Sequence, residues 1–294
     1  MLTRRSFLRG TLGGIAVGAA AAGNDARAAG RLAWPGPIGL ELYTVRQLLA
    51  QNSARTIKQV AEVGYKVVEA AVWNEPDPAA IMKDIRADGL TAPSGYVEVP
   101  KNLDPDWKTS VDSAHQYGMR YIVVGDNARL DAEQWRRRAD FFNQCGRVSH
   151  QAGIQFCYHA HFNEFYPVDH TTGYDILLEH CPPKHLQMEM DIFWVVYAGK
   201  DPLTYWRRYP GRFPLLHIKD LRKGISVHHF EDPSPTEPNP FVPVGQGRID
   251  WRRIFAHVNE AGAKYIFVEQ DRCDGSPLTA IKISYHYLRN LRLS

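Results

Sequence analysis

The sequence is short of cysteine, of long hydrophobic runs and, once its N-terminus is set aside, of net charge. Its four cysteines are scattered through 294 residues without CxxC spacing. A chain of this size builds its own core, so we expect free, partly buried thiols and no disulfide framework. No apolar run reaches the roughly 18 positions that a membrane-spanning helix needs, so we expect no membrane span.

The N-terminal segment has the order of parts found in an export signal. The pair Arg4 and Arg5 is followed by an Ala/Gly-rich stretch, and the small residues Ala26 and Ala28 flank one position at its end. This order resembles a twin-arginine signal, which directs export and does not anchor the protein in the membrane. We therefore expect residues 1–28 to be cleaved, the twin-arginine export machinery to be a partner, and the mature protein to reach the periplasm.

Removal of this segment also removes the excess of positive charge. It holds four arginines and one aspartate, so of the 35 basic and 32 acidic residues in the whole chain, 31 of each remain. A balanced chain lacks the basic surface by which proteins bind nucleic acids. We therefore expect no nucleic-acid partner.

The rest of the chain alternates between short apolar runs and segments with helical spacing. The runs lie at 38–43, 66–72, 91–97, 121–124, 154–161, 186–193, 215–220 and 265–270. Glycines such as Gly89, Gly153 and Gly262 end helical segments before the next run, as is typical of parallel sheets. Eight such units in roughly 260 residues predict an α/β fold, a single-domain (β/α)8 TIM barrel. We place the barrel at 37–294, after a linker at 29–36.

Two further features bear on this fold. The first run is not followed by a GxGxxG loop, which argues against an open doubly wound sheet. Residues 224–248, after the seventh run, form an unusually long connection rich in proline and polar side chains. An active-site loop and a solvated insertion both fit this segment.

Polar side chains gather where the last four runs end. Catalytic groups of a TIM barrel lie at the carboxyl ends of its strands. The fifth run ends in His159 and His161, with Glu164 behind them, and side-chain alternation puts Cys157 on the same side as the two histidines. The next three runs supply Asp191, His217 with Lys219, and Glu269. Mixed carboxylate and imidazole ligation suits one divalent cation such as Mn²⁺, Zn²⁺, Co²⁺ or Mg²⁺.

Each acidic residue has an alternative structural interpretation. A lone aspartate after a strand usually caps a helix, as we expect for Asp201 and Asp250. Asp191 differs, because it follows an apolar strand and precedes Ile-Phe-Trp rather than a helix. Glu41 and Glu69, on the first two runs, fit either the same cavity or ion pairs between strands.

The motifs that carry these residues resemble a known family. In chain order they are GLELYTVR at 39–46, YHAHFNEF at 158–165, MDIFW at 190–194, HIKD at 217–220, VGQGRIDW at 244–251 and VEQD at 268–271. They are similar to motifs of the sugar phosphate isomerase/epimerase family, the xylose isomerase-like TIM barrels, over residues 37–292. The sequence departs from the family at Ala160, where an asparagine is usual.

The resemblance implies a single divalent metal ion held at strands five to eight. Asp191, His217 and Glu269 correspond to family ligands. The ligand from strand five is either His159, by its position after the cysteine, or Glu164, the carboxylate of the FEF-like element. We favour Glu164, because three carboxylates and one imidazole balance a hard cation better.

The resemblance also implies chemistry on a carbohydrate. A metal ion polarises a carbonyl and acidifies the adjacent C–H, so that a base can remove the proton to give an enediolate. His159, His161 and Glu269 are the candidate bases, and Lys219 would bind a charged oxygen or pair with a carboxylate. The residues expected to contact the sugar are Glu41, Tyr43, Trp73 and Trp194.

Our first expectation is an isomerase or epimerase of an unphosphorylated sugar or keto-sugar, since export argues against a sugar phosphate. The alternative is a metal-dependent lyase or dehydratase acting on a 3-keto-glycoside or inosose-like substrate. A non-catalytic sugar-binding barrel fits less well, and so does a nuclease with three metal ions and a basic groove. The sequence leaves the oligomeric state open, a homo-oligomer included.

Overall fold

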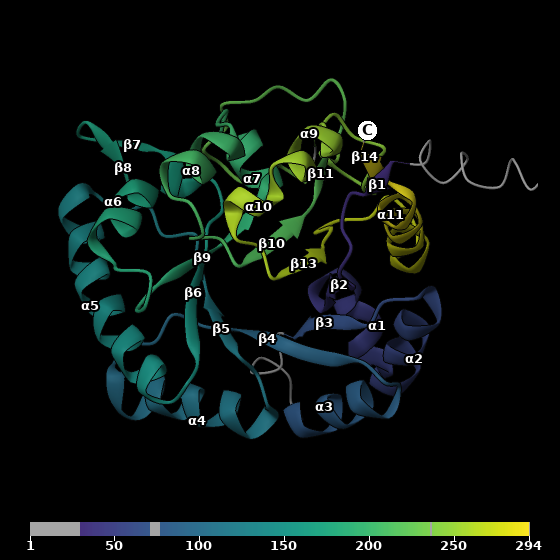
Figure 1. Ribbon diagram of the computed structural model, residues 1–294, viewed down its shortest axis with the longest axis horizontal. Coiled ribbons are helices and arrows are strands. Elements are labelled where there is room, and N and C mark those ends of the chain that lie inside the picture. The colour runs from purple at the N-terminus through teal and green to yellow at the C-terminus, as the bar shows by residue number, and fades with distance from the viewer. Residues whose placement is uncertain (1–29, 71–76, 236, 294) are drawn as a thin grey trace, which may run out of the picture.

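Eight parallel strands close into a barrel (Figure 1). The computed structural model describes residues 30–70, 77–235 and 237–293, so the expected signal segment at 1–28 lies outside the described residues. The barrel strands are β2 (Ile38–Glu41), β3 (Val67–Ala70), β4 (Thr91–Val97), β5 (Tyr121–Val124), β6 (Gln155–His159), β9 (Gln187–Asp191), β10 (Leu215–Ile218) and β13 (Tyr265–Val268). Each falls within a predicted run, and the predicted single-domain TIM barrel is confirmed.

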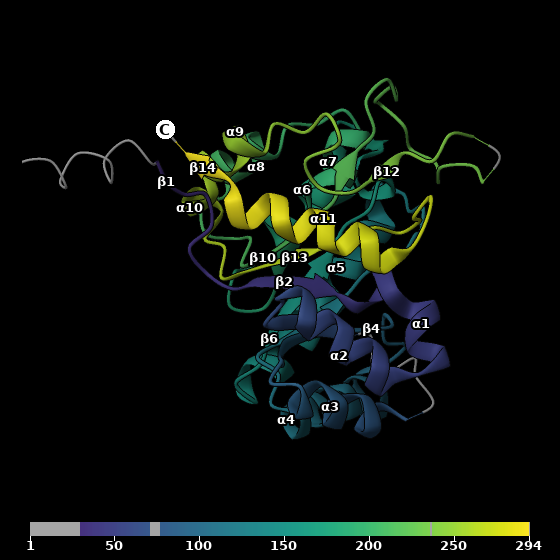
Figure 2. The same ribbon diagram turned by 90° about the vertical axis from the view of Figure 1, so that its right-hand side faces the viewer.

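Helices surround the barrel on its outside (Figures 1 and 2). They are α1 (Arg46–Gln51), α2 (Ser53–Val63), α3 (Pro78–Ala87), α4 (Lys108–Tyr117), α5 (Ala132–Gln151), α6 (Gly173–His180), α7 (Ile192–Tyr197), α8 (Pro202–Arg208), α9 (Trp251–Ala256), α10 (Val258–Ala261) and α11 (Pro277–Asn290). Asp201 and Asp250 accept hydrogen bonds from backbone N–H groups in the first turns of α8 and α9, so both predicted caps are confirmed. In the described part of the chain, every helix is too short or too polar to cross a membrane.

Side-chain alternation along the strands separates an inner from an outer core. An apolar floor inside the barrel consists of Val67, Val123, Cys157, Leu215 and Phe267. The residues that follow these along their strands, such as Val68 and Tyr158, belong to the outer core beneath the helices. Cys157 therefore faces inward as expected, and polar residues one layer above the floor face the interior of the barrel.

The two ends of the described chain meet. Strand β1 (Arg31–Leu32) pairs antiparallel with β14 (Arg292–Leu293), and the two strands lie side by side in both ribbon views (Figures 1 and 2). Ala33 is buried, and its N–H donates to the carbonyl of Leu291 at 3.0 Å. The segment expected to be a linker at 29–36 is thus partly packed against the C-terminal end of the chain.

The long connection after β10 is held at both of its ends. Strands β11 (Asp220–Leu221) and β12 (Phe241–Val242) pair antiparallel at its base. The buried carboxylate of Asp220 accepts hydrogen bonds from the N–H groups of Gly245 and Gly247 and from the indole of Trp251, all at 2.9–3.0 Å. One buried acceptor therefore fixes where the connection returns to the barrel.

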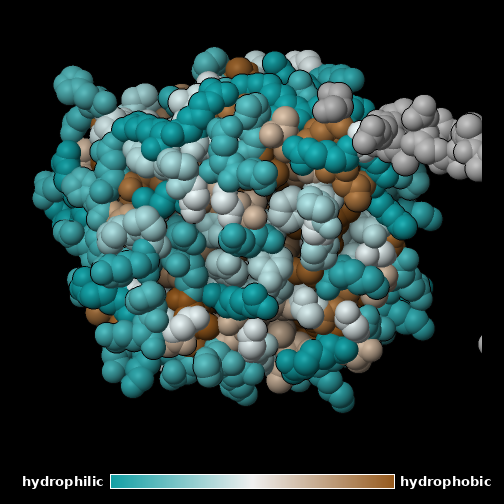
Figure 3. Space-filling model, in the orientation of Figure 1, coloured by the Kyte–Doolittle hydropathy of each residue, from teal (hydrophilic) through white to brown (hydrophobic). Residues whose placement is uncertain are grey.

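Smaller elements complete the fold. The antiparallel pair β7 (Pro167–Val168) and β8 (Thr171–Thr172) follows β6, and short helical segments lie at η1 (Leu42–Val45), η3 (Leu103–Trp107) and η4 (Asn163–Phe165). The face seen in Figure 3 is mostly hydrophilic, and its apolar side chains form scattered patches. All four cysteines are free, as predicted.

Gly146 provides a test of how the longest helix packs. It lies in α5, where a Cβ would stand 2.1 Å from the carbonyl oxygen of His185. Gly146→Ala should lower the free energy of unfolding by about 1–3 kcal/mol, because the helix must shift to relieve this overlap. Gly275→Ala is the control, since no atom lies within 4 Å of its Cβ, and its effect should stay within about 0.5 kcal/mol. Urea unfolding measures both; equal stabilities of the two variants would contradict the packing.

Candidate active site

A cavity of about 560 Å³ opens at the carboxyl ends of the barrel strands. Among the predicted site residues, those that line it are Glu41, Tyr43, His159, His161, Trp194, His217, Lys219 and Glu269. Trp73 lies outside the described residues. The cavity therefore brings together most of the side chains chosen from the sequence, at the end of the barrel where the fold places its chemistry.

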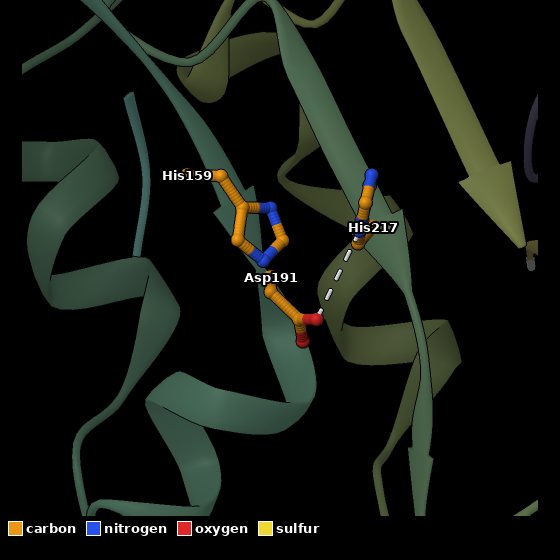
Figure 4. A group of neighbouring side chains, drawn as sticks. All are labelled: His159, Asp191 and His217. Carbon is orange, nitrogen blue, oxygen red and sulfur yellow. Dashed lines mark ion pairs between the residues drawn. The ribbon is translucent and has the colours of Figure 1, made fainter. Parts of the chain in front are cut away.

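Three side chains from neighbouring strands converge beside this cavity. His159 ends β6, Asp191 ends β9 and His217 lies in β10, and Figure 4 shows their side chains directed toward one another. Each offers one ligand atom, and these atoms lie within 4.8 Å of one another. Nδ1 of His217 and Oδ2 of Asp191, joined by the dashed line, are 3.9 Å apart. All three side chains are buried, so water competes little for them.

Asp191 has a structural role that was not expected from the sequence. Its Oδ1 accepts a hydrogen bond from the backbone N–H of Trp194 at 3.1 Å, so Asp191 caps α7. The expectation that no helix follows Asp191 is wrong, because Ile-Phe-Trp is the buried first turn of this short helix and shows no polar face. The cap leaves Oδ2 directed to Lys219, 2.8 Å from its Nζ.

Lys219 is a buried ammonium among three carboxylates. Its Nζ lies 2.7 Å from Glu269 and 2.8 Å from each of Asp191 and Asp271. Burial opposes its charge, but the carboxylates around it, led by Asp191, raise the pKa of Lys219 well above its ordinary value. Lys219 therefore stays protonated at the wall of the cavity, and it makes the carboxylate contacts that were one of its two expected roles.

His217 has a carboxylate on each side of its ring. Nδ1 lies 2.8 Å from Oε2 of Glu269, on the cavity side, and Nε2 lies 2.7 Å from Oε2 of Glu69. Nε2 is also 3.3 Å from Oε2 of Glu189. Burial opposes the charged form, but the carboxylates of Glu189 and Glu269 raise the pKa of His217 well above its ordinary value.

Glu69 and Glu189 form a buried carboxyl pair beneath the histidines. From the sequence, Glu69 fits either the cavity or an ion pair between strands, and Glu189 is not among the predicted site residues. Glu189 stands two residues before Asp191, on the same face of β9, and its Oε2 lies 3.0 Å from Nδ1 of His159. Burial raises the pKa of Glu189 to about 8, and the charge of Glu69 adds to the effect. Side chains two positions apart on a strand share a face, so Glu189 could have been identified by counting back two residues from Asp191.

Glu41 lies near this pair on the first strand of the barrel. It accepts a hydrogen bond from the N–H of Tyr43 at 3.1 Å, and burial followed by the charge of Glu69 raises its pKa well above the ordinary value. Glu41, Glu69 and His217 make a second group with ligand atoms within 4.8 Å.

His159, which ends β6, and His161, two residues after it, are neutral. Burial, with the nearby charges of His217 and Lys219 respectively, holds the pKa of His159 well below its ordinary value and lowers that of His161 to about 4. Among the described residues, Nδ1 of His161 has no hydrogen-bond partner although it is buried. His161 therefore offers a free imidazole beside the ring of His159, 4.7 Å away between centroids.

Glu164, the favoured ligand from strand five, is directed away from this group. Its Oε1 accepts from the hydroxyl of Tyr158 at 2.7 Å and its Oε2 from the N–H of His161 at 3.0 Å. Because Tyr158 faces the outer core, Glu164 lies on the outside of β6, and it belongs to neither group of potential ligands. The structure puts His159 in the position that we had favoured for Glu164.

The long connection contributes to the cavity wall. Asp232, Pro233 and Pro235 line the cavity, together with Phe241 of β12. Nη1 of Arg272, which also lines it, donates to the carbonyl of Ser234 at 3.3 Å. Of the two interpretations left open, the structure supports a loop of the site over a solvated insertion.

The donor set fits a divalent cation. Five buried carboxyl groups, those of Glu41, Glu69, Glu189, Asp191 and Glu269, share this region with the buried cation Lys219. A metal ion would add positive charge to a region in which acidic side chains outnumber basic ones. His159 is neutral, which is the form of histidine that binds metal. His159, Asp191 and His217 could hold it, and Glu269 lies beside them, 2.8 Å from Nδ1 of His217.

Comparison with known proteins agrees with the fold. Residues 57–291 match the xylose isomerase-like TIM barrel family. Inosose dehydratase of Geobacillus kaustophilus (strain HTA426) is 22% identical over 268 residues, which are 81% of this chain and 86% of the dehydratase. A sugar phosphate isomerase/epimerase from Parabacteroides distasonis ATCC 8503 superposes with a TM-score of 0.73 at 24% identity, over 87% of this chain and 95% of the other. The IOLI protein with a bound zinc superposes with a TM-score of 0.65 at 14% identity, over 88% and 100%. The chain belongs to the xylose isomerase-like TIM barrel family.

Proposed function

We propose that this protein is a metal-dependent dehydratase that removes water from a keto-sugar or an inosose-like cyclic ketone. The observation that carries the proposal is the meeting, in one cavity, of a free imidazole, a lysine ammonium and a group of carboxylate and imidazole ligands. Elimination of water next to a carbonyl needs these three parts: a base, an acid and a cation.

The metal ion, when bound, would polarise the substrate carbonyl and so acidify the adjacent C–H bond. His159, Asp191, His217 and Glu269 would hold it. His161 lines the cavity, and its Nδ1 has no hydrogen-bond partner among the described residues, so it is the candidate base for that proton. The neighbouring carbon then loses its hydroxyl group, which leaves as water after it takes a proton. The proton that His161 has taken from carbon would complete that water, and Lys219, which lines the same cavity as an ammonium, would donate a hydrogen bond to the departing oxygen.

The cavity walls suit a carbohydrate. Trp194 and Tyr43 supply aromatic surface, and Glu41 supplies a carboxylate that can accept hydrogen bonds from hydroxyl groups. The proposed twin-arginine export to the periplasm favours an unphosphorylated substrate.

The alternative within the same chemistry is our first expectation, an isomerase or epimerase. The inosose dehydratase relatives support the dehydratase, and the isomerase/epimerase structural neighbour keeps the alternative open.

One experiment separates the two reactions. The zinc- or manganese-loaded protein is incubated in deuterium oxide with a panel of inososes and free keto-sugars, and the products are examined by mass spectrometry. A dehydratase gives a product that is one water lighter and absorbs in the ultraviolet as an enone. An isomerase or epimerase gives a product of unchanged formula with one C–H replaced by C–D. No conversion of any member of the panel would contradict both.

Loss of a ligand should remove the metal without unfolding the barrel. We expect Asp191→Ala and His217→Ala to lower the metal content from one ion per chain to less than about a tenth, since each removes a charge or donor from a buried site. Elemental analysis of the purified proteins measures this, and circular dichroism checks the fold. Full metal content in either variant would show that the site is assigned wrongly.

The two candidates on strand β6 can be distinguished in the same way. His159→Ala should weaken metal binding at least tenfold, because its imidazole faces Asp191 and His217. Glu164→Gln should bind metal as the wild type does, because both carboxylate oxygens are occupied on the outside of the strand. Chelator competition gives both affinities. The reverse order of effects would restore Glu164 as the ligand.

A further inference from the structure

The buried carboxyl pair beneath the histidines, Glu69 and Glu189, has no part in the reaction described above. Both side chains are completely buried, and neither Glu69 nor Glu189 lines the cavity, so substrate does not reach them. Their contacts lie on one side of the two imidazoles, and the cavity lies on the other.

The distances assign one nitrogen of each histidine to this pair. Nδ1 of His159 lies 3.0 Å from Glu189, and Nε2 of His217 lies 2.7 Å from Glu69 and 3.3 Å from Glu189. These are hydrogen-bond lengths. A bound cation favours the ionised form of the carboxyl groups near it. An ionised carboxylate at this position keeps the proton on the nitrogen that faces it and leaves the other nitrogen free for metal.

The opposite nitrogens face the cavity. Nδ1 of His217 is 3.9 Å from Oδ2 of Asp191, a separation that admits an ion bound to both atoms. The same Nδ1 lies 2.8 Å from Oε2 of Glu269, which is itself a proposed ligand, so an ion bound to both would replace the hydrogen between them. His159 and His217 thus present different atoms to the same point, because they come from different strands and turn opposite edges toward the floor of the barrel (Figure 4).

We propose that Glu69 and Glu189 are positioning residues that fix opposite tautomers of the two metal-binding histidines, so that His159 binds the metal through Nε2 and His217 through Nδ1. This inference rests on the proposed metal site but not on the identity of the reaction. Glu189 contacts both imidazoles and so couples their orientations, whereas Glu69 reaches His217 from the opposite side of the barrel.

The tautomers can be read directly with zinc as the probe. In protein labelled with ¹⁵N-histidine and loaded with Zn²⁺, long-range ¹H–¹⁵N correlation spectra distinguish Nδ1–H from Nε2–H. We expect a proton on Nδ1 of His159 and on Nε2 of His217, with assignments from His159→Gln and His217→Gln. The opposite proton on either ring would overturn the inference while leaving the proposed function intact. Absence of zinc binding by the wild type would overturn both.

Carboxamide variants test the positioning role separately. Glu69→Gln and Glu189→Gln keep the shape of the side chain but lose its charge, and each should weaken Zn²⁺ binding by about 10- to 100-fold in chelator competition. Glu164→Gln makes the same change at a buried carboxyl outside the barrel, and its affinity should not change. If Glu69→Gln and Glu189→Gln change only the melting temperature of the metal-free protein, the pair fills space and has no positioning role. Return of affinity in Glu189→Asp would support the charge requirement.

Discussion

The candidate site depends on the burial of carboxyl groups inside a closed barrel. A carboxylate in the interior is costly unless a cation or hydrogen-bond donors meet it. Here Lys219 and His217 lie among these groups, each with carboxylates at hydrogen-bond distance on more than one side. These contacts fix the rotamers of side chains from several strands at once. The shape of the cavity depends on those rotamers.

The interior is layered, and each layer has its own chemistry. The apolar floor closes the barrel below, the buried carboxyl pair lies above it, and the cavity-lining histidines, lysine and carboxylates come last. The lower two layers are buried, so a charge change there is screened less than it would be at the surface. We therefore expect the chemistry of the cavity to depend on groups that do not line it.

The barrel and most of its cavity could be predicted from the sequence, because they follow from local patterns. Apolar runs, glycine stops and acidic caps repeat in the order of a parallel sheet, and polar residues at strand ends meet at one face. Two residues differ in the structure from what was expected. Glu164 was favoured as a ligand by charge balance and by its place in the FEF-like element, but the outward orientation of Tyr158 decides where it points. Asp191 was judged by the apolar residues after it, which form a helix buried on all sides. Glu189 was overlooked because it lies inside a strand and not at its end.

The contacts of His217 also set an order of events in folding. The hydrogen bond between His217 and Glu69 joins residues 148 positions apart, whereas Asp220 and Gly245, which anchor the long connection, are only 25 apart. Closure of a longer loop costs more chain entropy, so the connection can form locally while the centre of the site awaits closure of the whole barrel. A chain arrested before its last strands are added would possess a formed loop but no place for the ion.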